Sequence, residues 1–416
     1  MTADPSHALG QSLPLWSVLP FAGFLVTLAA FPLARPGLWS RHYGKVALAF
    51  GLPVAAWMLF VAPAELYHAA TEYVSFLVLL GTLFTISGGI LVRGSIRATP
   101  ALNAAFLAGG AVLSNVLGTT GASMLLLRPL LRANAHRKRS AHVVVFFIFV
   151  VANIGGALTP VGDPPLFLGY LKGVPFFWTL SALWPVWLFT VGVVTSVFVG
   201  VDAWFARKDL PGAGPPPDTT PVSLEGIINL FLLVPVIGSV FLPTPWREGT
   251  MLAAAALSAA LTPRRVREDN AFSWHPIKEV AILFAAIFAT MIPALLILKN
   301  RGGELGLAQP WQFFWASGIL SSLLDNAPTY LTFFSVARGM GGGTGVAGVA
   351  PGLLAAISAG SVFMGANSYI GNAPNFMVKA IAEESGVRMP SFPGYMAWSA
   401  AVLLPVFLLA TLLFFR

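Results

Sequence analysis

The chain has 416 residues, of which 56% are hydrophobic and only 10% are charged, and its mean hydropathy is +0.79. An ordinary soluble domain carries roughly 25% charged residues, so a water-facing surface cannot be built from this composition. Soluble enzymes, nucleic-acid-binding proteins and disordered proteins are therefore excluded. The chain also lacks cysteine, which excludes disulfides, thiolate metal sites and cysteine nucleophiles.

The hydropathy pattern predicts an all-α polytopic membrane protein, because each helical span needs about 20 apolar residues. Two apolar segments, 101–131 and 309–338, are interrupted in the middle, and we interpret them as re-entrant hairpins that enter and leave on one side. The expected full spans are 13–32, 45–63, 73–92, 143–165, 177–200, 225–243, 250–262, 277–298, 350–380 and 394–415, of which 143–165 and 350–380 are expected to be interrupted helices.

The distribution of basic residues agrees with this arrangement of spans. With the N-terminus outside, 18 of the 24 lysine and arginine residues, Arg97 among them, fall in cytoplasmic connections. The positive-inside rule requires this asymmetry, and it explains the net charge of +8 better than a nucleic-acid partner does. Binding of the basic run 132–142 to anionic lipid is the alternative interpretation of these charges.

The two halves of the chain follow the same order of elements. Residues 1–202 and 225–416 flank a polar linker at 203–224 that is rich in Pro and Gly, which is typical of a loop. Each half contains five full spans and one hairpin. Because five is odd, the second half enters the membrane in the opposite orientation. We therefore predict an inverted-topology repeat, as in many secondary transporters.

Two aligned pairs of motifs support the repeat. Residues 159–167 (TPVGDPPLF) align with residues 368–376 (SYIGNAPNF), which pairs Asp163 with Asn372. The hairpin tips at Asn115 and Asn326 show almost the same offset along the chain. Clusters of Gly, Pro and Asn that merely mark loops are the alternative interpretation, but they would not explain matched offsets.

Asp163 and Asp325 are the acidic residues that the sequence places within the membrane, whereas the others fall in loops or at span ends. A charge at the centre of a membrane helix costs roughly 2.5–3.5 kcal/mol on insertion scales. Acids in such positions are therefore candidates for proton carriers or cation ligands. Asp325 can in addition cap the half-helix that follows it.

The interrupted segments also carry the oxygen-bearing side chains that a dehydrated Na⁺ ion needs, while nearby Pro and Gly break the helices and free backbone carbonyls. The predicted cation-binding residues are Ser114, Asn115, Thr119, Thr120, Asn153, Thr159, Gly162, Asp163, Asp325, Asn326, Thr329, Asn367, Ser368 and Asn372.

Residues 153–165 (NIGGALTPVGDPP) and the tip 325–328 (DNAP) resemble motifs of the ion transporter superfamily. The similarity is to NhaD-type sodium/proton antiporters, arsenite-permease-like proteins and citrate-transporter-like permeases. It implies two inverted repeats of five helices and a hairpin, usually in a homodimer, with a scaffold domain and a mobile transport domain that moves like an elevator. Carboxylate symporters of this superfamily often carry Ser-Asn-Thr at both tips, whereas here the tips are 114–116 (SNV) and 325–327 (DNA). We expect a multi-pass protein of a bacterial inner membrane.

Sodium/proton exchange is the leading functional hypothesis. Burial disfavours a charged carboxylate and a bound cation favours it, so Asp163 and Asp325 can hold protons or Na⁺ but not both. The alternative is Na⁺-coupled symport of a di- or tricarboxylate such as citrate, with half-helix N-termini facing the substrate. Oxyanion efflux and an intramembrane aspartyl protease are further alternatives. We expect a transporter rather than an enzyme, with Na⁺, protons or a small carboxylate and membrane lipid as partners, no resident cofactor and no nucleic acid.

Overall fold

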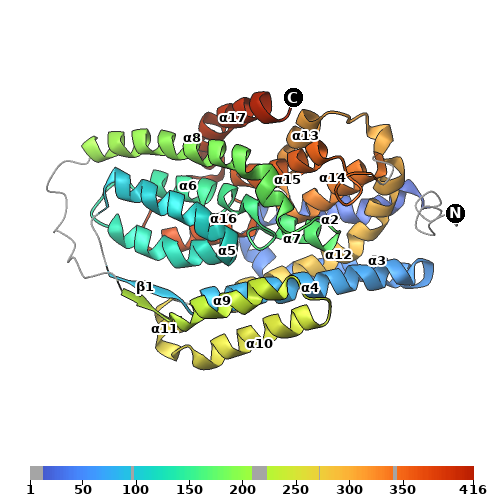
Figure 1. Cartoon of the computed structure of the whole chain (residues 1–416), viewed down its shortest axis with the longest axis horizontal. Coiled ribbons are helices and arrows are strands. Elements are labelled where there is room, and N and C mark those ends of the chain that lie inside the picture. The colour runs from blue at the N-terminus through green and yellow to red at the C-terminus, as the bar shows by residue number, and fades with distance from the viewer. Residues whose placement is uncertain (1–12, 95–97, 209–222, 271, 341–343) are drawn as a thin grey trace.

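The structure is a computed structural model that describes residues 13–94, 98–208, 223–270, 272–340 and 344–416. The described chain is almost entirely helical, which confirms the predicted all-α class (Figure 1). The helices are η1 (Leu15–Val18), α2 (Leu19–Ala34), α3 (Pro36–Val61), α4 (Pro63–Ser87), α5 (Pro100–Ala133), α6 (Ala141–Val150), η2 (Ile154–Leu158), α7 (Pro164–Leu171), α8 (Trp178–Lys208), α9 (Ile228–Ser239), α10 (Trp246–Leu261), α11 (Arg264–Asp269), α12 (His275–Arg301), η3 (Gly302–Leu305), α13 (Pro310–Leu323), α14 (Asn326–Met340), α15 (Pro351–Met364), η4 (Gly365–Asn367), α16 (Ala373–Glu384) and α17 (Phe392–Phe414). Two short antiparallel strands, β1 (Leu91–Arg93) and β2 (Ser223–Glu225), pair with each other.

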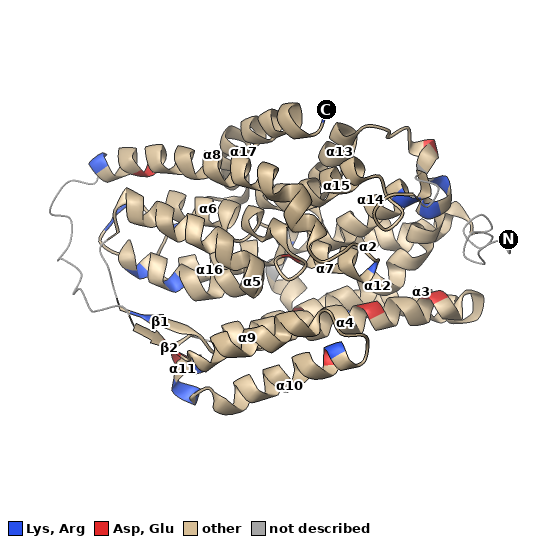
Figure 2. Cartoon of the chain, viewed as in Figure 1, with Lys and Arg blue, Asp and Glu red and all other residues tan. Residues whose placement is uncertain are grey.

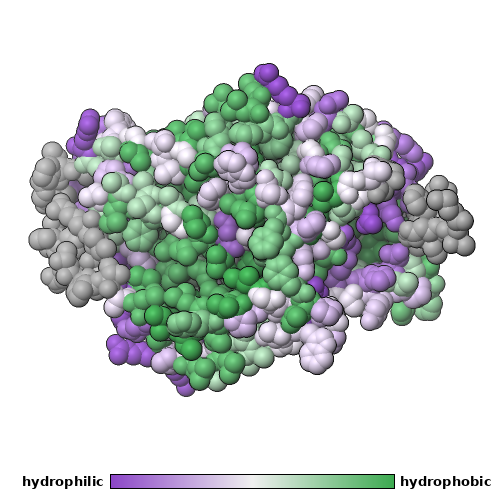
Figure 3. Space-filling model, viewed as in Figure 1, coloured by the Kyte–Doolittle hydropathy of each residue, from purple (hydrophilic) through white to green (hydrophobic). Residues whose placement is uncertain are grey.

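The helices have the length and surface of a membrane protein. Eight helical segments in the described part of the chain are long and apolar enough to cross a membrane. On the face shown in Figure 3, hydrophobic residues cover much of the middle and hydrophilic residues gather toward the two ends of the long axis. Most of the charged residues lie toward the same ends (Figure 2). The chain is therefore an integral, multi-pass membrane protein.

The first predicted hairpin is formed by α5, which turns back on itself. At Gly118 the backbone leaves the helical conformation with φ of 75°, a left-handed value that favours glycine because it has no Cβ. Beyond the outer ends of the two arms, the backbone N–H of Ala98 donates to the carbonyl of Ala133 at 3.0 Å. The two arms therefore run antiparallel, although their orientation in the membrane stays a prediction.

The second pair of arms is formed by α13 and α14, which are separated by Leu324 and Asp325. The rings of Phe313 and Phe333 meet edge to face, with their centroids 6.4 Å apart, so the arms also lie against each other. The break in this pair falls at the predicted tip, where Asp325 precedes the first residue of α14. As in α5, the tip brings the start of a helix into the interior.

The expected spans 143–165 and 350–380 are each divided into two helices. α6 and α7 are joined through η2, and α15 and α16 are joined through η4. The residues before α7 and α16 have nearly the same backbone conformation, with φ −145° and ψ 142° at Asp163 and φ −153° and ψ 141° at Asn372. Each is followed by Pro in the first two helical positions, where Pro is tolerated. The two breaks thus share a backbone geometry, whereas the inverted relation of the halves stays a prediction.

Three boundaries differ from the sequence-based expectation. α8 continues to Lys208, so the linker expected at 203–224 begins later than predicted, and its residues 209–222 lie outside the described residues, as does Arg97. The expected span 225–243 is the shorter helix α9, of 12 residues, whereas the expected span 250–262 is the slightly longer helix α10, of 16 residues. Hydropathy misplaced the end of α8 because the polar side chain of Asp202 is buried there rather than exposed in a loop.

The helices are arranged around the interrupted segments. α12 packs against α3 and α4, and α10 packs against α4 and α9, forming the layer along the lower edge of Figure 1. We call this layer, α2–α4 with α9, α10 and α12, the outer helix layer. α5, α6, α7 and α13–α16 form the central group, with α8 and α17 along its other side in Figure 1. α4 contacts both α5 and α7, so the broken segments lie against the outer helix layer.

Candidate functional site

Asp163 is the centre of the candidate site. It is 1% exposed, and its carboxylate accepts three hydrogen bonds, all from neutral side chains. Thr119 Oγ1 donates to Oδ1 at 2.9 Å, Asn372 Nδ2 donates to Oδ1 at 3.3 Å, and Asn326 Nδ2 donates to Oδ2. Within the described residues, no lysine, arginine or histidine forms an ion pair with Asp163. The buried carboxylate is therefore solvated by neutral donors alone.

The three donors come from the starts of three helices. Thr119 is the first residue after the kink in α5, Asn326 is the first residue of α14, and Asn372 precedes α16. Asp163 itself precedes α7. Helix N-termini carry positive partial charge from unpaired N–H groups. Four of them thus meet around one carboxylate and partly offset the cost of burying it.

Asp325 lies next to this centre and is half-buried. Its Oδ1 accepts a hydrogen bond from the backbone N–H of Ala327 at 3.1 Å, and Thr329 Oγ1 donates to its backbone carbonyl at 3.0 Å. Asp325 therefore caps the start of α14, as the sequence allowed. This contact uses one carboxylate oxygen and leaves the other for a cation or a proton.

A small hollow lies between Asp325 and the outer helix layer. Thr120, Asp325 and Asn372 line one side of this hollow, and Phe84 of α4 and Phe284 of α12 line the other. Its volume is about 60 Å³, and a neighbouring hollow of about 30 Å³ is lined by Asp163, Thr119 and Thr120. Because one water occupies about 30 Å³ in the liquid, these spaces match a cation and a few waters.

Other predicted residues hold the first break in shape. Asn115 Nδ2 donates to the carbonyl of Gly155 at 2.7 Å, and its Oδ1 accepts from the N–H of Leu158 at 2.8 Å. Thr159 Oγ1 donates to the carbonyl of Asn115 at 2.6 Å, and Ser114 Oγ donates to the carbonyl of Val151 at 2.8 Å. These side chains replace the helix hydrogen bonds that the break removes, and they do not contact Asp163.

Gly162 is required by close packing rather than by its conformation. A Cβ atom at this position would collide with the carbonyl oxygen of Gly156. The N–H of Thr119 also donates to the carbonyl of Gly162 at 2.9 Å, which fixes the tip of α5 beside Asp163. Gly162, which the sequence predicts as a cation-binding residue, thus supports the backbone beside Asp163 in this structure.

The second break is held by an equivalent set of contacts. Asn367 Nδ2 donates to Ser322 Oγ at 2.9 Å, and Ser368 Oγ donates to the carbonyl of Ser322. Like Asn115 and Thr159, the predicted residues Asn367 and Ser368 bind a hairpin tip to a helix break. Their hydrogen bonds, like that of Thr329 to the carbonyl of Asp325, go to partners other than the carboxylate of Asp163.

Asn375 is a polar residue of this region that the sequence reasoning missed. Its Oδ1 accepts a hydrogen bond from Asn153 Nδ2 at 2.7 Å, and its Nδ2 donates to the carbonyls of Gly365 and Ser368 at 2.9 and 2.8 Å. The pair joins the two helix breaks directly. Asn375 lies within the aligned motif 368–376, but its counterpart in the first half is the apolar Leu166, so the alignment drew no attention to it.

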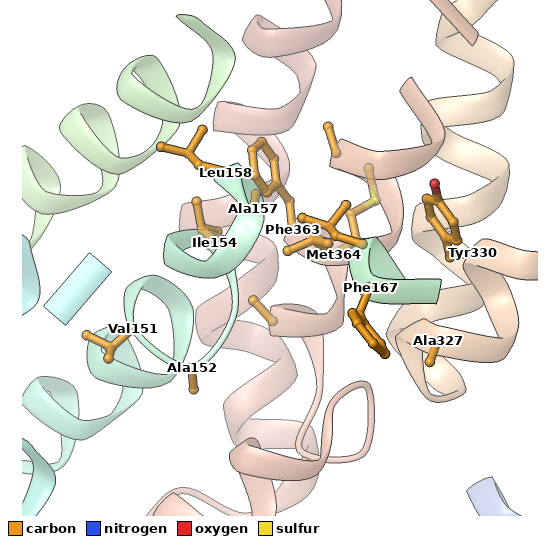
Figure 4. Packing of buried hydrophobic residues seen from close by; sticks show 14 of the residues in the cluster. Val151, Ala152, Ile154, Ala157, Leu158, Phe167, Ala327, Tyr330, Phe363 and Met364 are labelled. Carbon is orange, nitrogen blue, oxygen red and sulfur yellow. The ribbon is translucent and has the colours of Figure 1, made fainter. Parts of the chain in front are cut away.

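Buried apolar side chains pack around the two breaks. Figure 4 shows Ile154, Ala157 and Leu158 from the first break near Phe363 and Met364 from the second. All of these residues are at most 9% exposed. The low dielectric of such surroundings strengthens every interaction of a buried charge.

Asp202, which the sequence places at a span end, is a further buried acid. Asp202 is 0% exposed, and it forms ion pairs with Arg137 and His142, whose Nε2 lies 2.8 Å from Oδ1. Asn103 Nδ2 also donates to its Oδ2 at 3.0 Å. The sequence placed Asp202 at a span end because its partners lie 60 or more residues away and only the fold brings them together.

The geometry of the two central acids differs from that of an aspartyl protease. There two carboxyl groups share one proton. Among the described residues no hydrogen bond joins Asp163 to Asp325, and the Nδ2 group of Asn326 bonds to the Asp163 oxygen Oδ2.

Comparison with known proteins gives the family of this chain. No curated protein matches the sequence. The model of one family, CitMHS_2, matches residues 10–415, and its description reads "Putative citrate transport". This match confirms the resemblance to citrate-transporter-like permeases of the ion transporter superfamily, and it supports a secondary transporter. Because the match covers nearly the whole chain, the protein belongs to this citrate-transport family.

Proposed function

We propose that the protein exchanges Na⁺ for protons at Asp163, with Asp325 as a second carboxylate of the same site. The observation that carries this proposal is the burial of Asp163 among neutral donors. An ionised carboxylate in such a place is costly unless a cation or a proton accompanies it. Since either one satisfies the charge, and both cannot bind the same oxygens together, occupancy by one excludes the other.

Asp202 provides an internal comparison. Both Asp163 and Asp202 are buried, but Asp202 is neutralised permanently by Arg137 and a contact with His142. An acid with a fixed cationic partner has no need of a transported ion, so its role is structural. Asp163 lacks such a partner within the described residues, which is the condition for exchangeable binding.

Na⁺ binding requires a local change in the amide groups. In the structure Asn326 and Asn372 direct their Nδ2 groups at Asp163, and the buried Oδ1 of Asn326 has no hydrogen-bond partner among the described residues. Rotation of these amides turns their oxygens toward the carboxylate. Together with Thr119 Oγ1 and the Asp163 oxygens they then form an oxygen-lined site for Na⁺, which is the transported ion.

Alternating access follows from the arrangement of the two groups of helices. We propose that the central group moves as a unit past the outer helix layer in an elevator-like cycle. At the small hollow, the outer helix layer presents the apolar side chains of Phe76, Phe84 and Phe284. Sliding of the central group along this surface therefore breaks few polar contacts. The predicted inverted repeat would give two equivalent end states. A homodimer held by the outer helix layer belongs to this proposal and is tested by mass measurement in nanodiscs.

Proton-flux measurement in vesicles tests the exchange. The purified full chain is reconstituted with an internal pH dye, and Na⁺ or Li⁺ is added without any organic solute. We expect proton movement that depends on Na⁺. Because protons and Na⁺ compete for Asp163, the apparent KM for Na⁺ rises as the pH falls. Proton movement that is absent without an organic anion would contradict exchange.

The second candidate is Na⁺-coupled uptake of a small carboxylate such as citrate. It is supported by the description of the family and by the four helix N-termini around Asp163, since such ends favour anions. The same vesicles decide between the two functions. Accumulation of radiolabelled citrate driven by a Na⁺ gradient supports symport, and Na⁺-driven proton flux without citrate supports exchange.

A further inference from the structure

A large hollow lies at the end of the molecule away from the candidate site. Its volume is about 720 Å³, within the roughly 300–1,000 Å³ of ligand pockets. It is formed by the end of α5, the following loop, the start of α6, the 385–388 loop, and side chains of α8 and α17. Six basic residues line it, Arg128, Arg132, Arg137, Lys138, Arg139 and Arg388, with Asp269 as the acid in its wall.

Most of this positive charge is not neutralised by the protein. Arg137 pairs with Asp202, and Asp269 pairs with Arg93 and Arg265 outside the wall of the hollow. Arg132 donates to the carbonyl of Val92 at 2.6 Å. Like Arg132, the other four basic side chains of the wall form no ion pair within the described ranges: Arg128, Lys138, Arg139 and Arg388. Several guanidinium groups around one space favour an anion with several oxygens, above all a phosphate group.

The floor of the hollow is held rigidly. The side chain of Arg137 is 4% exposed and is fixed by Asp202. Asn134, which also lines the hollow, exchanges hydrogen bonds with Asn103 at 3.0 and 2.8 Å. A charged group held in place before binding loses less conformational entropy when the ligand arrives. Such fixed side chains are typical of a preorganised binding site, whereas a mobile charged surface lacks them.

The position of the hollow indicates where its anion comes from. It lies at the end of the molecule where lysine and arginine residues gather around α5, α16 and α11 (Figure 2), the end that the charge distribution assigns to the cytoplasm. Its wall also contains the aromatic side chains of Phe205 on α8 and Trp398 on α17. Aromatic residues beside basic ones are typical of the membrane interface, and basic pockets between spans bind anionic headgroups.

We propose that this hollow binds the phosphate headgroup of an anionic phospholipid from the cytoplasmic leaflet. The basic side chains contact the phosphate oxygens, and Phe205 and Trp398 pack against the apolar part of the lipid. The bound lipid bridges the first hairpin, α6, α8 and the end of α16. This site is separate from the transport site and does not depend on which solute is carried.

Native mass spectrometry of the purified full chain tests the site with phosphatidylglycerol, cardiolipin and phosphatidylcholine as probes. We expect retention of the two anionic lipids and little retention of phosphatidylcholine. Near a membrane surface each basic residue contributes about five-fold in affinity. The double variant Arg128→Gln/Arg388→Gln is therefore expected to bind phosphatidylglycerol roughly 30-fold more weakly.

A matched control removes two charges at the same end but outside the hollow. Arg264 and Arg265 on α11 are exposed, so Arg264→Gln/Arg265→Gln should retain the lipid as the wild type does. Equal loss in this control, or no loss in the hollow variant, overturns the site. Displacement by glycerol 3-phosphate at the concentration of the lipid assigns the hollow to a soluble anion and overturns the lipid source. Should the double variant fail to fold, Arg388→Gln alone, in an exposed loop, carries the test.

Discussion

Asp163→Asn removes the negative charge at the centre of the candidate site and changes little else. An asparagine oxygen at this position still accepts the hydrogen bonds from Thr119 and Asn372. Its new amide group faces Asn326, whose Oδ1 has no partner within the described residues, so a turn of that amide restores the third bond. We therefore expect a folding cost of about 1 kcal/mol or less.

The loss of ion binding is much larger than this cost. A cation in contact with a carboxylate oxygen is about 2.5 Å away, and at an effective dielectric constant of about 20 the attraction is about 7 kcal/mol. Dehydration of the ion offsets part of this attraction. If only a third of it contributes to affinity, the Kd for Na⁺ rises roughly 50-fold in the variant.

Two measurements check this prediction on the same preparation. In vesicles, the proton flux that follows addition of Na⁺ should fall to the level of empty vesicles. In detergent, Na⁺ at 100 times the wild-type Kd should stabilise the wild type by about 2.7 kcal/mol and the variant, whose Kd is roughly 50-fold higher, by only about 0.6 kcal/mol. Asp269→Asn, which removes an acid near the surface, serves as the control and should retain both effects. A folded Asp163→Asn protein with normal flux would refute the assignment.

Three further predictions follow from neighbouring contacts. Arg137→Gln leaves the buried carboxylate of Asp202 without its arginine partner and should lower the free energy of unfolding by about 3–5 kcal/mol. Thermal denaturation in detergent measures this loss, and a change below about 1 kcal/mol would argue against the structural role of the pair. Gly162→Ala places a Cβ against a backbone carbonyl and should reduce flux at least ten-fold, whereas Gly192→Ala, which enters open space, should not. Thr119→Val removes a hydrogen bond to a charged group, worth about 1.5–3 kcal/mol, and should weaken Na⁺ binding roughly 10- to 100-fold, while Thr119→Ser should bind almost normally.

Several features of this protein were determined by the sequence itself, because they depend on local chemistry. Low charge and long apolar runs predict membrane helices in any fold, since an unpaired backbone is too costly in lipid. Pro and Gly near Asp163 and Asn372 predict helix breaks, because Pro lacks an N–H and ends the helix hydrogen bonding. The structure has both breaks at the aligned positions. Asp163 and Asp325 stood out for the same local reason, as acids beside broken helix ends.

Which polar groups meet depends on how the helices pack in three dimensions. Asn326 and Asn372 reach Asp163 from the other half of the chain, and spacing along the sequence does not predict that contact. The predicted oxygen donors divide in the structure into those at the carboxylate, such as Thr119, and those that replace lost helix hydrogen bonds, such as Asn115. The burial of Asp202 was likewise invisible in sequence, because whether a charge is neutralised depends on partners that packing brings together in space.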